Sequence, residues 1–437
     1  SYTYAVANYF VLFANLGIKN YGSRTIAMVR NNKEELNRNF SEILSIHIIF
    51  SIIVIFVYLV LLFFFVEDNL VIFLIQSIYV FAAVFDINWF FFGIEKFKLT
   101  VGRNTLVKIL SVFLVLVFVK TQTDLWIYAL ILALSVFVGQ SVVWFALKQY
   151  VSWRRPSWAN MKQHIRPLFV LFLPILALSL YKYMDKIMLG SISSNVQVGF
   201  YENAEKIINV PMSLIMAFGV VLMPRIANMV TSKDKGEVFK LIDMSMEAVM
   251  LLAIAISFGL AGISFVLAPI FFGYEFEECG ILIMGLAVTV PFMAFANVIR
   301  TQYLIPYKED KIFVVSLFLG AAVNLIVNII LIPYMAARGA VIGTIFAEII
   351  VCIYQSYFVR KKIFIKKYLL NTIPPILIGI VMFVFVFQIG NVMNINIVTL
   401  ILQLLVGMFI YAVGVFLLML KSRTRLMVLL RKFVVRY

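Results

Sequence analysis

The sequence is poor in charged residues, in histidine and in cysteine. Only 13% of its 437 residues are charged, whereas a soluble domain typically has about 25%. Its two histidines and two distant cysteines, Cys279 and Cys352, indicate neither a metal centre nor a disulfide framework. The sequence contains no GxxxxGK[ST] phosphate loop and no GxSxG nucleophile motif. We therefore expect no metal, no cofactor other than a coupling ion, and no enzymatic activity.

Long apolar segments dominate instead. Hydrophobic residues make up 63% of the chain, and its mean hydropathy is +1.03. A membrane-spanning helix needs about 20 mostly apolar residues. We predict an all-α polytopic membrane protein with thirteen spanning segments. Their approximate bounds are 2–17, 43–65, 69–92, 105–119, 125–147, 167–190, 206–228, 245–272, 280–299, 312–333, 339–359, 370–389 and 396–420.

The net charge of +16 is distributed unevenly over the connecting loops. Most lysines and arginines lie in alternate loops and in the C-terminal tail, whereas the opposite loops, such as 66–69 and 121–124, are short and contain no lysine or arginine. By the positive-inside rule the basic loops and the tail are cytoplasmic, so the charge does not require a nucleic-acid partner. Thirteen segments would place Ser1 outside the cell. We therefore expect one further helix upstream, which gives fourteen in total.

A charged stretch with tryptophan and proline, KQYVSWRRPSWANMKQHIR at 148–166, separates the first five segments from the other eight. A faint repeat, GIEKF at 93–97 and IPYKED at 305–310, favours two duplicated halves. The predicted parts are an N-terminal lobe at 1–147, a cytoplasmic linker at 148–166, a C-terminal lobe at 167–368, and the last two helices with a basic tail at 369–437.

One spanning segment contains three charged residues in the stretch SLYKYMDKIMLG at 179–190. Lys182, Asp185 and Lys186 share one helix face, and each charge near the bilayer centre costs about 2.5–3.5 kcal/mol. Asp185 can neutralise one lysine, which leaves a positive site facing an internal, water-filled cavity. The alternative is that these residues lie near the outer interface, where the lysine side chains snorkel to water.

Two carboxylates also lie deep in apolar segments, Asp86 in VFAAVFDINWFF and Glu348 in GTIFAEIIVCI. A carboxylate at such depth is either paired with a cation or partly protonated. Both states suit coupling to a proton or sodium gradient. The alternative is a static hydrogen bond between helices.

Two arginines at helix ends, Arg24 and Arg300, are further candidates for the lining of a central cavity, although contact with lipid headgroups is the alternative. Arginine and lysine form charge-assisted hydrogen bonds with phosphate oxygens. A cationic cavity therefore suits the diphosphate of a lipid-linked sugar, whose polyprenyl tail stays in the lipid. The last two segments are candidates for part of a groove for that tail.

Five stretches in combination resemble one family: NYGSRTIAMVR at 20–30, WFFFGIEKFK at 89–98, SLYKYMDKIMLGSIS at 179–193, GFYENAEKI at 199–207 and MPRIANMV at 223–230. The chain resembles the bacterial polysaccharide-repeat (Wzx-type) flippases of the multidrug/oligosaccharidyl-lipid/polysaccharide exporter superfamily. The resemblance implies fourteen helices, arranged as two pseudo-symmetric six-helix lobes in a V plus two C-terminal helices. It also assigns Arg24, Asp185 and Lys186 to motifs of the family.

The implied function is translocation of undecaprenyl-diphosphate-linked oligosaccharide repeat units from the inner to the outer leaflet of the bacterial cytoplasmic membrane. Alternating access, driven by an ion gradient, would serve the synthesis of capsule or another surface polysaccharide. The expected substrate-binding residues are Arg24, Lys182, Lys186 and Arg300, and the expected ion-coupling or charge-pairing residues are Asp86, Asp185 and Glu348. Expected partners are the glycolipid, the bilayer, a polysaccharide polymerase and other assembly proteins.

Three alternatives stay open. A lipid II flippase has nearly the same sequence features. A cation-coupled multidrug antiporter of the same superfamily would have a more acidic and aromatic cavity. A polymerase or ligase usually has a sizeable external loop with arginine or histidine, whereas the longest external loop here, near 191–205, has neither.

Overall fold

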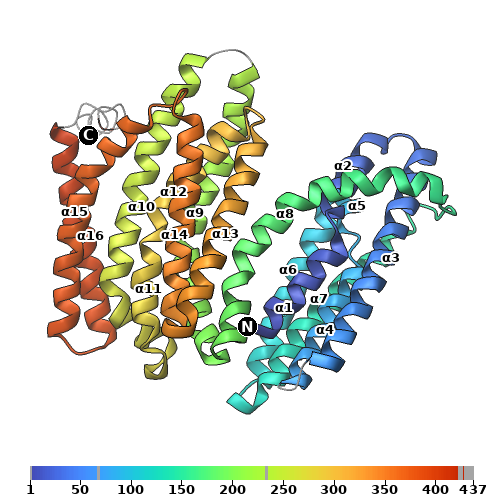
Figure 1. Ribbon diagram of the computed structural model, residues 1–437, viewed down its shortest axis with the longest axis horizontal. Helices are drawn as coiled ribbons and strands as arrows, with labels where there is room; N and C mark the ends of the chain where they lie inside the picture. Colours follow the sequence, from blue (N-terminus) through green and yellow to red (C-terminus); the bar gives the residue numbers. More distant parts are fainter. Residues whose placement is uncertain (1, 66–68, 232–234, 422–426, 428–437) are drawn as a thin grey trace. The chain divides into compact units, whose positions relative to one another are not determined.

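The computed structural model describes residues 2–65, 69–231, 235–421 and 427, and these residues form α-helices with short connections and no β-strand (Figure 1). Ten helical stretches within them are long and apolar enough to cross a membrane. The prediction of an all-α polytopic protein is therefore confirmed, and the chain is a multi-pass membrane protein.

The chain divides into two compact units, residues 1–183 and residues 184–437. The first contains α1 (Tyr2–Asn15), α2 (Ile18–Val29), α3 (Lys33–Phe65), α4 (Leu70–Val84), α5 (Asn88–Gly93), α6 (Phe97–Phe118), the short η1 (Gln122–Asp124), α7 (Leu125–Leu147) and most of α8 (Trp158–Ile192). The second contains the end of α8, then α9 (Asn195–Thr231), α10 (Lys235–Phe272), η2 (Tyr274–Phe276), α11 (Cys279–Ala287), α12 (Thr289–Ile299), η3 (Arg300–Leu304), α13 (Asp310–Met335), α14 (Ala337–Val359), α15 (Ile365–Val392) and α16 (Ile397–Lys421).

The boundary between the units lies within α8, and the stretch 148–166 that we expected to link two lobes belongs to the first unit. Side chains of α3 hold the backbone of this stretch. Asn37 Oδ1 accepts a hydrogen bond from the Ser152 amide at 3.0 Å, and Ser41 Oγ accepts one from the Arg154 amide at 2.9 Å. These bonds satisfy backbone donors that regular secondary structure does not satisfy.

Each of the thirteen predicted segments coincides with a helix or a pair of helices. Three interruptions of the helices stand out, of which the second falls inside a predicted segment, 69–92. The first separates α1 from α2 at Leu16 and Gly17, which both have positive φ. Glycine is required at position 17, because a Cβ atom there would lie 2.8 Å from the Leu168 carbonyl oxygen of α8. The second break, at 85–87, separates α4 from α5, and the third is a π-helical turn at Arg300–Leu304.

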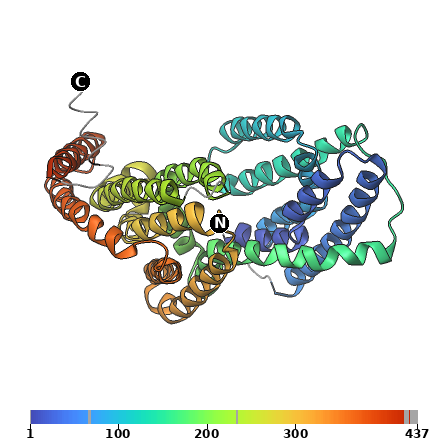
Figure 2. The ribbon, with the colours of Figure 1, turned by 90° about the horizontal axis from the view of Figure 1, so that it is seen from above.

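In the second unit α15 and α16 lie side by side at the edge, and α10 lies against both (Figures 1 and 2). Their shared apolar core contains Ile254, Ile263, Met382, Val386 and Tyr411. These helices also expose many large apolar side chains, including Phe385 and Phe409. Such exposure suits a surface that faces lipid rather than water.

Candidate functional site

A buried polar cluster surrounds Asp185 in the second unit. The Asp185 side chain is 5% exposed. Its Oδ1 accepts hydrogen bonds from Asn324 at 2.9 Å and from Asn328 at 2.5 Å, and its Oδ2 accepts them from Tyr201 at 2.7 Å and from Thr344 at 3.0 Å. Four helices, α8, α9, α13 and α14, therefore meet at one carboxylate. These neutral donors compensate the cost of burying its charge.

The local sequence explains why the cluster forms. Asn324 and Asn328 are four residues apart and therefore lie on one face of α13. Gly343 allows α14 to approach that face closely, because a Cβ atom at position 343 would lie 2.1 Å from Asn328 Oδ1. That oxygen is buried and has no hydrogen-bond partner. The cluster therefore has unused acceptor capacity next to a carboxylate, as a bound cation requires.

The next residue, Lys186, forms an ion pair with Glu205 of α9, with 2.8 Å between Nζ and Oε2. The lysine side chain is 11% exposed and the glutamate side chain 26%. We had expected Asp185 to neutralise one lysine, and the structure adds Glu205 as the partner of Lys186. Directly after Glu205 on α9, the exposed Lys206 pairs with Glu202 at 3.2 Å. The side chain of Lys182 lies outside the described residues.

Arg300 and Glu348 lie in the same unit. Arg300 opens the π-helical turn and donates to Asn297 Oδ1 at 2.6 Å, and its guanidinium lies 5.4 Å from the centre of the Phe313 ring. The negative charge of Glu348 on α14 stabilises the positive charge of the Arg300 guanidinium. Next to Arg300, both amide atoms of the fully buried Gln302 lack hydrogen-bond partners. π-turns are frequent at functional sites, so this region is a second polar site of the unit.

In the first unit Asp86 lies at the break between α4 and α5. Its Oδ1 accepts hydrogen bonds from the backbone amide of Asn88 at 3.0 Å and from the Asn88 side chain at 2.6 Å. The same Asn88 donates to Gln140 Oε1 at 2.9 Å and accepts from Arg103 Nη2 at 3.0 Å. Asp86 therefore belongs to a network that joins the helix break to α6 and α7.

Arg24 is exposed on α2, in the stretch NYGSRTIAMVR. Its neighbours in that stretch hold α2 in place. Gly22 lies against Trp89 of WFFFGIEKFK, where a Cβ atom would approach the ring to 2.6 Å, and Arg30 pairs with Glu95 at 2.6 Å. The two sequence motifs thus interlock, and within the first motif Arg24 is exposed and is a candidate for contact with a substrate.

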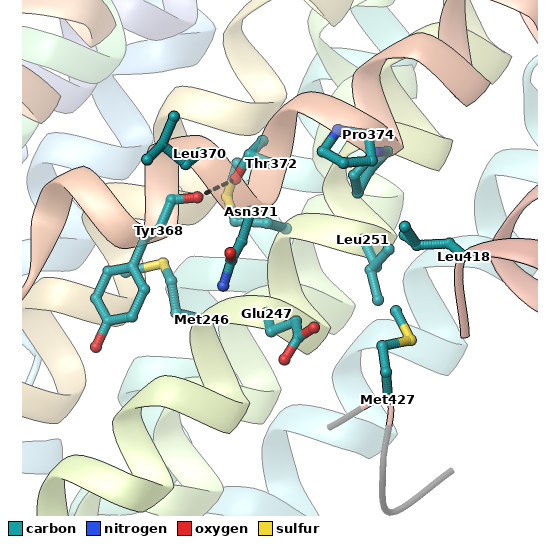
Figure 3. A pocket seen from close by; sticks show the side chains of 12 residues that line it. Met246, Glu247, Leu251, Tyr368, Leu370, Asn371, Thr372, Pro374, Leu418 and Met427 are labelled. Carbon is teal, nitrogen blue, oxygen red and sulfur yellow. Dashed lines mark hydrogen bonds between the residues drawn. The ribbon is translucent and has the colours of Figure 1, made fainter. Parts of the chain in front are cut away.

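Two of the cavities in the described part of the second unit differ in size and lining. The larger one, of about 450 Å³, has an almost wholly apolar lining from α10, α11, α12, α14 and α15 that includes Phe258, Phe292 and Ile376. The smaller one, of about 100 Å³, lies among α10, α15 and Leu418 near the end of α16 (Figure 3). Its polar lining residues are Glu247 of α10 and Tyr368, Asn371 and Thr372 of α15 (Figure 3).

Sequence reasoning proposed Asp185, Lys186, Arg300, Glu348 and Asp86 as site residues, and the structure places the first four in one unit and Asp86 in the other. It missed the neutral partners, because only charged residues were counted at membrane depth. The signal was available, since an asparagine pair four residues apart in the apolar segment 312–333 is itself costly to bury. Among the described residues no group of three His, Cys, Asp or Glu side chains is placed to hold a metal ion.

This chain is similar in sequence to known transport proteins and similar in fold to a solved structure. A putative O-antigen transporter of Shigella dysenteriae is 25% identical over 357 residues, which are 77% of this chain and 86% of that protein. The lipid II flippase MurJ of Bacillus subtilis (strain 168) is 28% identical over 224 residues, which are 47% of this chain and 41% of that protein.

Among solved structures, a lipid II flippase MurJ in an inward closed conformation has a TM-score of 0.70 at 16% identity. The match covers 94% of this chain and 92% of that one. At this identity the likeness shows the fold alone. The family described as "Polysaccharide biosynthesis protein" matches residues 1–230, which are more than half of the chain. The chain belongs to the family of polysaccharide biosynthesis proteins.

Proposed function

We propose that this protein is a flippase that moves undecaprenyl-diphosphate-linked oligosaccharide repeat units from the inner to the outer leaflet of the bacterial cytoplasmic membrane. The observation that carries the proposal is the placement of charge: Asp185, the Lys186–Glu205 pair and Arg300 are held inside a helix bundle whose outer surface is apolar. Such charges are costly at membrane depth and mark pathways for polar cargo or ions. The family and the Shigella relative support a polysaccharide precursor as the cargo.

The headgroup would bind through cations, for which we propose Arg24, Lys182, Lys186 and Arg300. In the structure Lys186 forms an ion pair with Glu205. A diphosphate has to compete with that carboxylate, and it can do so because it presents several charged oxygens to one ammonium group. Lys186 would thus pair with Glu205 when no substrate is bound and with phosphate when substrate is bound. Binding would then depend on the charge of the substrate, and the lysine would have a partner in both states.

The polyprenyl tail would use the apolar cavity of about 450 Å³ that α15 helps to line. Its size lies within the range of roughly 300–1,000 Å³ that is typical of ligand pockets. A lining of Phe258, Phe292 and Ile376 suits an isoprenoid chain and offers few groups to a sugar. The proposed tail groove therefore involves α15 of the last two helices, together with α10 and α12.

We further propose that a coupling ion, H⁺ or Na⁺, binds at Asp185, with Asp86 and Glu348 as further coupling or charge-pairing residues. The Asp185 carboxylate and the buried Asn328 Oδ1, which has no hydrogen-bond partner, supply hard oxygen atoms for such an ion. The two compact units would act as the lobes of an alternating-access transporter, with the basic loops and the C-terminal tail in the cytoplasm.

The test is reconstitution into liposomes with a defined undecaprenyl-diphosphate oligosaccharide, with and without a proton or sodium gradient. We expect the sugar to reach the opposite leaflet faster with one of the two gradients. Lipid II is the second candidate cargo, favoured by the likeness to MurJ, and a cationic drug is the third. Transport of lipid II or of the drug alone would replace the proposed cargo with that one.

A further inference from the structure

Glu42, His164 and Tyr21 form a hydrogen-bonded chain across three helices of the first unit, and no function above uses it. His164 Nε2 of α8 lies 2.9 Å from Glu42 Oε2 of α3, and its other ring nitrogen, Nδ1, lies 2.6 Å from the hydroxyl oxygen of Tyr21 on α2. The histidine side chain is 4% exposed and the glutamate side chain 1%. One buried imidazole thus has a partner at hydrogen-bond distance on each of its two nitrogens.

The other charged side chains close to this chain in the sequence are exposed. They are Lys19 and Arg24 on α2, Arg38 on α3, and Lys162 and Arg166 on α8. α1 and α4, which pack against α3, and α5, which packs against α2, contain no Asp, Glu, Lys, Arg or His. His47 of α3 is buried as well, but it is five residues from Glu42 and therefore lies on another side of that helix. In this described part of the first unit, His164 is the buried group that can balance the charge of Glu42.

The chain can hold one additional proton with its heavy atoms where they are. With a neutral imidazole, Nε2–H donates to Glu42, Nδ1 accepts from the Tyr21 hydroxyl, and the group as a whole is negatively charged. With an imidazolium, both ring N–H groups donate, the Tyr21 oxygen accepts, and the group is neutral. Because a buried charge without a counter-charge is costly, burial favours the state that holds the additional proton.

Tyr21 connects the buried ring with solvent, because its own side chain is only half-buried. Burial raises the pKa of Tyr21 above its usual range, so its hydroxyl keeps its hydrogen. The hydroxyl oxygen can accept a proton from water while its own hydrogen passes to Nδ1, which leaves the tyrosine unchanged. The stretch 148–166, which contains His164, is predicted to be cytoplasmic, so we expect the proton to come from the cytoplasm.

We propose that His164 is a proton-binding site of the first unit, with Glu42 as its counter-ion and Tyr21 as its connection to solvent. The bound proton fastens α8 to α2 and α3. Its loss leaves Glu42 without a counter-charge and weakens that attachment. α8 continues from the first unit into the second, so the site acts on the helix that connects them. The inference deepens the proposed function, on which its role in transport rests, with a proton site separate from Asp185.

The chain has only two histidines, so the site can be observed directly. The full chain is labelled with ¹⁵N-histidine, its imidazole signals are followed by NMR as pH is varied, and His47→Gln assigns the signal of His164. We expect His164 to change between imidazolium and neutral imidazole. Glu42→Gln should lower its titration midpoint by about one pH unit or more, because the counter-ion is lost. Glu34→Gln on the same helix is the matched control and should leave the midpoint unchanged, since that side chain is 81% exposed.

Two results of the titration would overturn the proposal. One is a His164 ring that keeps a single protonation state over the whole pH range in which the protein stays folded. The other is a midpoint that Glu42→Gln moves no further than Glu34→Gln does. Should Glu42→Gln fail to fold, Tyr21→Phe replaces it: the loss of the acceptor for Nδ1–H should also lower the midpoint, and an unchanged midpoint would likewise overturn the proposal.

Proteoliposomes test the role of the site in transport. A pH gradient should accelerate translocation of the glycolipid less in His164→Gln than in the wild-type protein, whereas Glu34→Gln should respond as the wild-type protein does. An unchanged response of His164→Gln to the gradient would contradict the coupling role. If the wild-type protein translocates no glycolipid, the proposed function fails, and the NMR titration still decides whether His164 binds a proton.

Discussion

At the scale of single residues, buried charges in this protein are compensated by side chains on other helices. Lys186 of α8 pairs with Glu205 of α9, and His164 of α8 bonds to Glu42 of α3 with 2.9 Å between Nε2 and Oε2. Removing one partner of such a pair leaves an uncompensated charge, so the cost exceeds the value of the contact. Burial should therefore decide which pairs matter for stability.

The Lys186–Glu205 pair tests this rule against the exposed Lys206–Glu202 pair. We expect a coupling free energy of about 1–3 kcal/mol between Lys186→Ala and Glu205→Gln in a double-mutant cycle on unfolding in detergent. The same cycle for Lys206 and Glu202 should give about 0.3–0.5 kcal/mol, because the Lys206 side chain is 62% exposed. Equal coupling in the two pairs would show that Lys186 is not held in a buried pair.

Gly343→Ala tests the tight packing around Asp185. The added methyl group would meet Asn328 Oδ1, so we expect a loss of stability of about 1–3 kcal/mol and impaired translocation. Gly199→Ala in α9 is the control, because no atom lies within 4 Å of its added Cβ, and alanine favours the helix by up to ~1 kcal/mol. Thermal unfolding measures both variants, and a stable Gly343→Ala protein would contradict the packing seen here.

At the scale of helices, the short helices α2 and α5 of the first unit pack against each other and against the long helix α3. α2 and α5 interlock through Gly22 and Trp89, and Trp89 also stacks on Phe40 of α3 with 5.6 Å between ring centres. Conspicuous motifs in the sequence can therefore be structural. Motif membership alone does not separate Arg24 from its neighbours, and Arg30, which is exposed as well, differs in that it pairs with Glu95.

Trp89→Ala should destabilise the first unit by about 3–5 kcal/mol, because the ring is 2% exposed and packs among aromatic side chains. Protein yield in membranes and thermal unfolding are the measurements. Trp153→Ala removes an exposed ring and should change stability by no more than about 0.5 kcal/mol. A tolerated Trp89→Ala would remove the structural interpretation of the WFFFG motif.

At the scale of the whole molecule, apolar segment length predicted the helices, and loop charge predicted an orientation that can be measured directly. Single cysteines replace the exposed Tyr274 and Phe364 in a chain with Cys279→Ser and Cys352→Ser. In intact cells an impermeant thiol reagent should label position 274 and not position 364, since the basic loop at 360–367 is predicted to be cytoplasmic. The reverse labelling pattern would invert the topology and the proposed direction of transport.

The sequence could not predict contacts between distant segments. Asp185 and Lys186 were identified from their depth in a spanning segment, but Asn324, Thr344 and Tyr201 converge on Asp185 from three other helices and are uncharged. The break at Asp86 was also missed, because it interrupts an apolar segment, 69–92, whose hydropathy stays high.

The central claim is that buried cationic side chains bind a diphosphate-linked glycolipid. The most direct test measures translocation of undecaprenyl-diphosphate oligosaccharide in proteoliposomes by the wild-type protein, Lys186→Ala and Lys206→Ala. A charge-assisted hydrogen bond contributes about 1.5–3 kcal/mol, so Lys186→Ala should translocate roughly 10- to 100-fold more slowly, while Lys206→Ala stays close to the wild-type rate. Equal rates for Lys186→Ala and the wild-type protein, or no translocation by the wild-type protein, would contradict the claim.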